Sequence, residues 1–188
     1  TESLKSRLID SGYQVIESVS STDIPTIAMS DGRTATQRSH DESIKNLILI
    51  DLCVDFKTTK RLALTHSAQC TQEAFGHILS VLQKTGFLVT IMRDIAGMIL
   101  TRTVAMLANE AADLVHQEVT SPKDVDMAMT LGTGYPLGPL SWADKIGLET
   151  ISEILTNLCA HYGSARYRIS PILQRKSTSN ELFHGIDK

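Results

Sequence analysis

The sequence predicts two successive domains, an α/β domain over residues 1–93 and an all-α domain over residues 94–188. Two observations predict this division. In the first part, short apolar runs of strand length alternate with helical segments, which is the pattern of a sheet covered by helices. In the second part, apolar residues recur at the spacing of amphipathic helices. A chain of 188 residues, 42% of them hydrophobic, is long enough for two small domains.

The N-terminal segments are short and interrupted by turn residues. Residues 2–9 predict a helix that stops at Gly12, because its apolar residues share one side. Residues 13–19 and 24–29 are rich in apolar and β-branched residues and predict two strands. Residues 34–45 are polar and weakly periodic, which is compatible with either a short surface helix or a loose crossover.

The best predicted strand lies over residues 46–53, because NLILIDLC is an almost continuous apolar run of strand length. Residues 60–65 and 87–92 predict two further strands, with a helix over residues 71–85 between them. Strands that alternate with helices indicate a parallel, doubly wound arrangement. The first domain is therefore expected to be a partial or degenerate Rossmann-like domain with a parallel sheet.

The second domain begins with a long amphipathic helix. Its predicted apolar stripe consists of Leu100, Val104, Leu107, Ala108, Ala111, Leu114 and Val115. Glu110, Asp113 and Gln117 are expected on the opposite side. The helix is therefore predicted to be a wall of a helical domain, with one side buried and one side exposed.

Further helices follow in the second domain. Ser121-Pro122 combines an N-cap residue with a first helical position that suits proline, so a helix begins there and stops near Gly132. Residues 140–146 predict a short amphipathic segment, and a last full helix ends at Gly163. Trp142 is expected to be buried at the turn before that helix. From Ser177 onward the tail is polar and is expected to fray.

Composition excludes several classes of function. The net charge of -3 is nearly balanced and no Lys/Arg stripe is interleaved with aromatic residues, so nucleic acid is not expected as a partner. No apolar run reaches the roughly 18 residues of a membrane span, and no signal pattern precedes the first helix, so no membrane contact and a cytoplasmic location are expected. Cys53, Cys70 and Cys159 are widely spaced, which favours reduced, buried thiols over a metal site or a disulfide set. A first residue other than Met is typical of a piece of a longer protein.

One set of fixed spacings covers about half of the chain. Its residues are Asp94, Gly97, Arg102, Asn109-Glu110-Ala111, Ser121-Pro122, Asp124, Asp126, Ala128-Met129, Leu131-Gly132, Gly134-Tyr135-Pro136 and Gly138-Pro139. In these residues the sequence resembles the C-terminal helical domain of the 3-hydroxyacyl-CoA dehydrogenase family. A second set consists of Trp142, Ala143-Asp144, His161-Tyr162-Gly163 and Arg166-Tyr167-Arg168. It is most similar to the second helical repeat of the two-module 3-hydroxyadipyl-CoA or 3-hydroxybutyryl-CoA dehydrogenases of phenylacetate catabolism.

The resemblance implies that the longer parent protein oxidises a 3-hydroxyacyl-CoA with NAD. Enzymes of the family use a His general base that a Glu orients, and an Asn on the long helix near the substrate carbonyl. Comparison with the family motifs places Asp51, Ala63 and Thr101 at these three positions. Alanine cannot orient a base, and a carboxylate lacks the near-neutral pKa of an imidazole. The chain is therefore expected to contain no catalytic residue.

NAD binding by a dinucleotide fold requires a G-x-G-x-x-G loop after the first strand, where backbone N–H groups approach the pyrophosphate. The sequence contains no such loop. Its nearest imitation, over residues 132–138, follows a predicted helix and contains Pro136, so a rigid turn between helices is expected there. The chain is thus expected to bind neither NAD nor a metal, whereas the parent enzyme uses NAD.

The remaining polar residues have structural explanations. Surface or structural roles are expected for His66 near a strand end, His77 and His116 on helix faces, and His161 at a helix end. A basic cluster near the C-terminus consists of Arg166, Arg168, Arg175 and Lys176. These four side chains either attract a CoA phosphate or keep the tail solvated, and solvation is favoured.

The sequence therefore predicts the C-terminal, non-catalytic half of a 3-hydroxyacyl-CoA dehydrogenase. Its expected role is structural, either self-association through the helical domain or pairing with an upstream helical domain of the parent. The alternative is a stand-alone interaction or acyl-CoA-binding module that has lost dehydrogenase activity.

Overall fold

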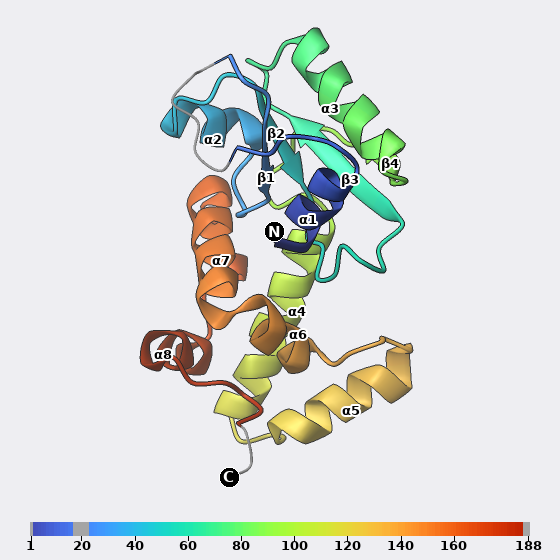
Figure 1. Cartoon of the computed structure of the whole chain (residues 1–188). Coiled ribbons are helices and arrows are strands. Elements are labelled where there is room, and N and C mark those ends of the chain that lie inside the picture. Colours follow the sequence, from blue (N-terminus) through green and yellow to red (C-terminus); the bar gives the residue numbers. More distant parts are fainter. Residues whose placement is uncertain (1, 17–22, 186–188) are drawn as a thin grey trace. The chain divides into compact units, whose positions relative to one another are not determined.

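The computed structural model describes residues 2–16 and 23–185 of the chain (Figure 1). The chain divides into two compact units, Thr1–Met98 and Ile99–Lys188, termed unit 1 and unit 2. Unit 1 contains the sheet, and unit 2 is helical in its described residues.

Unit 1 is a four-stranded sheet with helices on its faces. Its elements in chain order are α1 (Glu2–Asp10), β1 (Thr26–Met29), α2 (Ala35–Asp41), β2 (Leu47–Ile50), β3 (Arg61–His66), α3 (Gln72–Lys84) and β4 (Leu88–Ile91). The strands lie in the order β1-β2-β3-β4. All of β2 is buried, which confirms the apolar run over residues 46–53 as an internal strand.

The sheet is mixed. β1 pairs with β2, and β3 pairs with β4, in the predicted parallel direction, but β2 and β3 are antiparallel. Parallel neighbours need a crossover, and α2 and α3 provide one for each parallel pair. Residues 51–60 between β2 and β3 contain no helix, so the chain turns back and pairs antiparallel. The predicted Rossmann-like class is confirmed, with this one pair as the difference from the predicted parallel sheet.

The two faces of the sheet have separate cores. Phe75, Ile78 and Leu82 of α3 pack on one face together with Leu4 and Leu8 of α1. Ala35 of α2 is buried on the other. Alternate residues of β2 serve the two cores, Ile48 and Ile50 the first, Leu47 and Leu49 the second. Because both faces of β2 are buried, apolar side chains are favoured on each face, which explains the continuous apolar run.

Residues 34–45 were expected to form either a short surface helix or a loose crossover, and they contain the helix α2. Thr34 is the N-cap of α2. Asp94, which lies near the C-terminal end of unit 1 in the sequence, is a second cap. Its carboxylate accepts hydrogen bonds from Ala35 N and Thr36 N at 2.6 and 2.9 Å. The negative charge of Asp94 therefore lies at the positive end of the α2 dipole.

The first predicted strand, over residues 13–19, is wrong for the part that the structure describes. Residues 13–16 have no regular structure, although Tyr13 and Val15 pack against the core of unit 1. Residues 17–19 lie outside the described residues. The second predicted strand, over residues 24–29, is confirmed as β1.

Unit 2 is a group of helices arranged against one long helix (Figure 1). Its elements are α4 (Leu100–His116), α5 (Pro122–Thr133), α6 (Pro139–Ile146), α7 (Leu148–Tyr162), the short 3-10 helix η1 (Ala165–Tyr167) and α8 (Pro171–Ser179). α6, α7 and α8 all pack against α4.

The buried side of α4 differs from the predicted stripe. Leu100 and Leu114 are 50% and 40% exposed, whereas Asp113, expected on the exposed side, is buried. The buried residues are mostly small and consist of Thr101, Val104, Ala105, Ala108, Asn109, Ala111, Ala112 and Asp113. Because three helices pack against α4, small side chains on this side let their axes approach closely.

The turn between α5 and α6 is close to its prediction. α5 begins at Pro122 with Ser121 as its N-cap, and Gly134 ends it in the left-handed conformation, with φ of 70°. Trp142 is half-buried and not buried as expected, because α6 turns Leu140 and Ala143 toward the interior instead. Its ring packs against Tyr135, with 5.4 Å between the ring centroids.

The C-terminal part is more ordered than its polar sequence indicates. The tail was expected to fray from Ser177 onward. Instead, α8 continues to Ser179, and Phe183 after the helix is buried. Asp144 on α6 explains this order. Its carboxylate accepts hydrogen bonds from Phe183 N and His184 N, both at 2.9 Å, and so tethers the tail to α6.

Asn109 on α4 holds the segment between η1 and α8. The residue is 2% exposed. Its Nδ2 donates a hydrogen bond to Arg168 O at 2.9 Å, and its Oδ1 accepts one from Ser170 N at 2.8 Å. One turn further along α4, Asp113 pairs with the Arg168 guanidinium at 2.7 Å. Asn109 therefore satisfies a backbone donor and a backbone acceptor where no regular structure supplies partners.

Replacing Asn109 with alanine leaves Ser170 N, in a buried residue, and Arg168 O, in an exposed residue, without their side-chain partner. We expect Asn109→Ala to lower the free energy of unfolding by about 1 to 3 kcal/mol, the cost of one unsatisfied buried donor at Ser170 N. Urea denaturation followed by circular dichroism measures this. Glu110→Ala, at the exposed neighbouring position, is the control and should change it by less than about 0.5 kcal/mol. Equal effects of both variants would contradict the assignment.

Candidate functional site

Asp51 and Ala63 lie opposite each other on neighbouring strands. Asp51 directly follows β2, and its backbone N donates to Ala63 O of β3 at 3.0 Å. Residues opposite each other in an antiparallel pair point to the same face of the sheet. A base at position 51 and a carboxylate at position 63 would therefore be within reach of each other. The geometry suits an acid–base pair, but the residue types present do not supply one.

The Asp51 side chain is engaged locally. Asp51 is 3% exposed, and its Oδ1 accepts a hydrogen bond from Leu52 N at 2.8 Å. Ala63 has no polar side-chain atom. Thr101, the third position, lies in the first turn of α4 in unit 2 and is 1% exposed. Its hydroxyl can donate one hydrogen bond but is shorter than the amide of an asparagine.

The glycine-rich segment over residues 132–138 connects two helices, as predicted. It ends α5 at Gly134 and precedes α6, whose N-cap is Gly138. A Cβ atom at Gly138 would lie 2.1 Å from Cγ of Asp126. Glycine is therefore required at position 138 by the close approach of a carboxylate from α5, and its role is steric.

Asp126 of α5 accepts hydrogen bonds from several donors of unit 2. It is 7% exposed, and Oδ1 accepts from Leu140 N at 2.9 Å. Oδ2 accepts from Ser141 N at 2.8 Å and from Ser141 Oγ at 2.6 Å. His184 Nε2 lies 2.9 Å from the same oxygen. The carboxylate thus caps the N-terminus of α6 from α5, where the helix dipole favours a negative charge.

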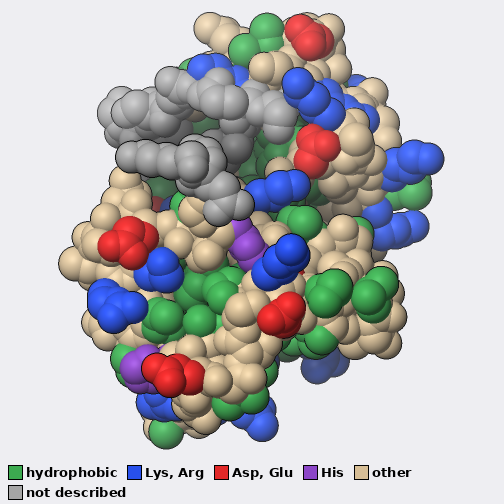
Figure 2. Space-filling model, turned by 90° about the horizontal axis from the view of Figure 1, so that it is seen from below, with side chains coloured by type: hydrophobic (Ala, Val, Ile, Leu, Met, Phe, Trp, Pro, Cys, Tyr) green, Lys and Arg blue, Asp and Glu red, His purple; other side chains and the backbone are tan. Residues whose placement is uncertain are grey.

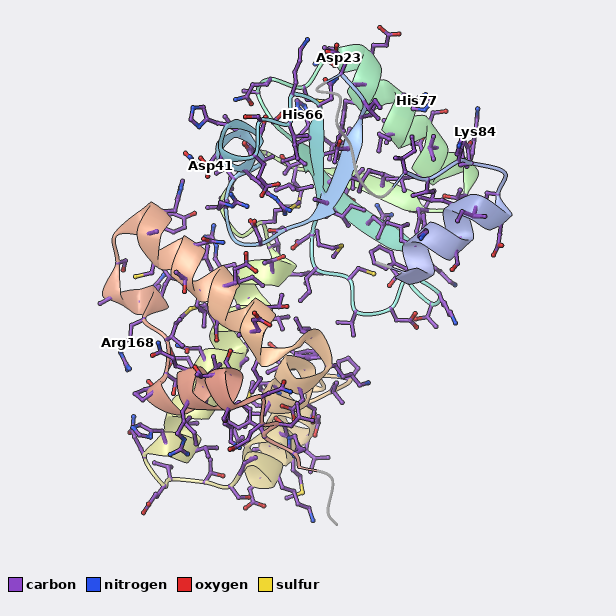
Figure 3. All side chains as sticks on the ribbon, turned by 60° about the vertical axis from the view of Figure 1, so that its left-hand side comes forward. Asp23, Asp41, His66, His77, Lys84 and Arg168 are labelled. Carbon is purple, nitrogen blue, oxygen red and sulfur yellow. The ribbon has the colours of Figure 1, made fainter. Side chains whose placement is uncertain are left out.

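The histidines singled out in the sequence have structural or surface positions. His66 Nδ1 lies 2.9 Å from Ser67 O, and the ring packs against Phe75. His77 and His116 are exposed, His77 on α3 (Figure 3). His161 is also exposed and packs edge-on against Tyr162. His184 was not singled out, because its partner Asp126 lies far away in the sequence and no local pattern signals the pair.

The three cysteines are free thiols as expected, but only Cys70 is buried, whereas Cys53 and Cys159 are half-buried. Burial raises the pKa of the Cys53 and Cys70 thiols, which disfavours the nucleophilic thiolate. Arg168, at the surface of unit 2 in Figure 3, pairs with Asp113. Lys176 Nζ lies 3.3 Å from Glu181 and donates to Leu182 O at 2.9 Å. Two of the four clustered cations therefore have partners within unit 2.

The described residues form neither a cluster of metal ligands nor a membrane-spanning helix. Among residues 2–16 and 23–185, no three His, Cys, Asp or Glu side chains gather as metal ligands would. Over the same residues, no helix combines the length and apolar character of a membrane span. On the face drawn in Figure 2, the described Lys and Arg side chains are scattered among Asp and Glu side chains.

Unit 1 contains an apolar pocket of ≈ 540 Å³. It is lined by residues of α1, β1, β2 and α3 and by the segments next to α1 and β1, including Leu8, Ile27 and Ile78. Polar members of the lining are Lys5, Tyr13, Gln14, Thr26 and His77. The pocket lining includes Ile50 but neither Asp51 nor Ala63.

Comparison with known proteins agrees with the two units. Residues 27–95 match the family model described as the 3-hydroxybutyryl-CoA dehydrogenase reduced Rossmann-fold domain. Residues 97–184 match the 3-hydroxyacyl-CoA dehydrogenase C-terminal domain.

Individual proteins similar in sequence to this chain are dehydrogenases of 3-hydroxyacyl-CoA compounds by name. The chain is 37% identical over 131 residues to a 3-hydroxyadipyl-CoA dehydrogenase of Escherichia coli, a match that covers 70% of this chain and 27% of the relative. It is 31% identical over 105 residues to a probable 3-hydroxybutyryl-CoA dehydrogenase of Bacillus subtilis, covering 56% of this chain and 37% of the relative. The matches therefore span only about a quarter to two fifths of these relatives.

Solved structures give the same result. The crystal structure of 3-hydroxybutyryl-CoA dehydrogenase from Escherichia coli superposes with a TM-score of 0.76 at 30% identity, over 89% of this chain and 38% of that chain. The Ralstonia eutropha (S)-3-hydroxybutyryl-CoA dehydrogenase reaches 0.70 at 19% identity, over 84% of this chain and 56% of that one, which supports the fold alone. The chain belongs to the 3-hydroxyacyl-CoA dehydrogenase family, of which it carries a reduced Rossmann-fold domain and a C-terminal helical domain.

Proposed function

We propose that this chain is the C-terminal, non-catalytic structural half of an NAD-dependent 3-hydroxyacyl-CoA dehydrogenase. The observation that carries the proposal is the pair of positions 51 and 63. They lie opposite each other on β2 and β3, where an acid–base pair would fit, yet hold aspartate and alanine. Similarity to a 3-hydroxyadipyl-CoA dehydrogenase favours that substrate for the parent enzyme.

Oxidation of a 3-hydroxyacyl-CoA needs a base to remove the hydroxyl proton while hydride passes to NAD. A neutral imidazole accepts that proton near neutral pH, and an oriented carboxylate stabilises the imidazolium. Ala63 cannot orient a base, and Thr101 replaces the amide that would lie near the carbonyl. The three substitutions together remove the base, its orienting group and the substrate contact.

The N-terminus of α2 also argues against a bound dinucleotide. Pyrophosphate binding uses free N–H groups at the start of the helix after the first strand, which glycines expose. The loop from β1 to α2 contains Gly32 as its one glycine. The N–H groups of Ala35 and Thr36 donate to Asp94. A carboxylate of the chain therefore occupies the place that a phosphate would need.

The structural role rests on the exposed apolar side chains of unit 2. Val119 is 66% exposed, and Met127 and Leu131 on α5 are 49% and 80% exposed. Such side chains near one helix favour contact with another protein surface. We propose that this part of unit 2 mediates self-association, or pairs with the upstream helical domain of the parent.

The alternative is a stand-alone interaction or acyl-CoA-binding module. The pocket in unit 1 favours it, because a mainly apolar pocket of ≈ 540 Å³ is in the size range of small-molecule sites. Calorimetry with an acyl-CoA discriminates between the two. A saturable signal that Leu8→Trp abolishes would favour the module, whereas the structural half gives none. A G-x-G-x-x-G segment upstream in the parent gene would favour the dehydrogenase.

The proposal predicts that the chain binds no NAD and turns over no 3-hydroxyacyl-CoA. The variant Asp51→His, Ala63→Glu, Thr101→Asn should remain inactive as well, because it restores the side chains but not the cofactor site. Calorimetry with NAD and absorbance of NADH measure the two properties. Micromolar affinity for NAD, or NADH production that follows the purified chain, would contradict the proposal.

The proposal also predicts self-association at tens of micromolar protein in sedimentation velocity. Leu131→Glu should weaken it at least tenfold, because a buried, unpaired carboxylate opposes an apolar interface. Val54→Glu, at a 50% exposed position of unit 1, is the matched control and should leave it unchanged. A monomeric wild-type chain at these concentrations would refute the self-association role.

A further inference from the structure

Helix α5 is held to the rest of unit 2 by few side chains. Of its residues only Val125 and Asp126 are buried, while Leu131 is 80% exposed. Figure 1 shows α5 at the margin of unit 2, next to α6. A helix with so small a buried surface depends strongly on each specific contact that fixes it.

The C-terminal segment, residues 181–185, supplies one of these contacts. It is first fixed to α6, because Asp144 accepts hydrogen bonds from Phe183 N and His184 N, each at 2.9 Å. Phe183 is 7% exposed, and the ammonium group of Lys176 lies 5.6 Å from its ring centroid. These contacts set the backbone at His184 and so determine where its side chain reaches.

From that position His184 reaches α5. Its Nε2 lies 2.9 Å from Oδ2 of Asp126. The same carboxylate accepts hydrogen bonds from Leu140 N and Ser141 N at the start of α6. The segment is thus attached to α6 through Asp144 and to α5 through Asp126.

We infer that the C-terminal segment, residues 181–185, is a clamp that fixes α5 against α6, with His184 as its contact to α5. The clamp has a consequence for the surface of α5. Met127 and Leu131 are carried by this helix, so the clamp sets the position of the side chains assigned above to association. This consequence rests on the proposed association role, whereas the clamp itself rests only on contacts within unit 2.

Hydrogen exchange of the full chain tests the clamp. In His184→Ala, the amides of α5 should exchange at least about tenfold faster, corresponding to the loss of about 1.4 kcal/mol from the local opening free energy. The amides of α7 should exchange at the wild-type rate. His184→Gln, whose amide can still donate to Asp126, should restore much of the protection.

His161→Ala is the matched control, because His161 is an exposed histidine of the same unit that packs against Tyr162. It should leave α5 unchanged. Wild-type exchange of α5 in His184→Ala would overturn the clamp. Faster exchange throughout unit 2, as much in α7 as in α5, would overturn it too, because the effect would then be general destabilisation.

Sedimentation of the same variants separates the clamp from the association role. If both are correct, His184→Ala weakens self-association several-fold and His184→Gln less. If the wild-type chain is monomeric, the association role fails, and the exchange of α5 alone decides on the clamp. Unchanged self-association in His184→Ala, with fast exchange in α5, supports the clamp and refutes its control of the association surface.

Discussion

The helical unit depends on the carboxylate of Asp126. A buried carboxylate is costly unless donors satisfy it, and here Leu140 N, both donors of Ser141 and the His184 ring surround it. These donors come from α6 and from the C-terminal segment, while Asp126 itself belongs to α5. One charge therefore joins three segments that the sequence separates. Gly138 lacks a side chain because that charge lies against it.

The same solution recurs at other places where backbone groups lack partners. Asp94 closes the start of α2, and Asn109 holds the segment before α8. All three residues belong to the spacing pattern through which the sequence resembles the dehydrogenase family. In this chain, these three residues of the pattern make contacts that position helix ends. This explains how a family fold persists while positions 51, 63 and 101 hold aspartate, alanine and threonine.

Local patterns predicted the elements well and the distant contacts poorly. The apolar run of β2, the cap at Ser121 and the stop at Gly134 are local, and the sequence predicted all of them near their observed places. The buried side of α4 was mispredicted because packing of three helices selects small side chains over large ones. The ordered tail was missed because its partners, Asp126 and Asp144, lie about forty or more positions earlier.

The hydrogen bonds of Asp126 hold three segments of the helical unit together, and removal of its carboxylate tests this role. We expect Asp126→Ala to lower the free energy of unfolding in urea by about 3 kcal/mol or more, because buried donors at the start of α6 lose a charged acceptor. Glu153→Ala, at an exposed position of α7, should change it by less than about 0.5 kcal/mol. A loss of stability in Asp126→Ala no larger than that in Glu153→Ala would show that the helical unit does not depend on this carboxylate.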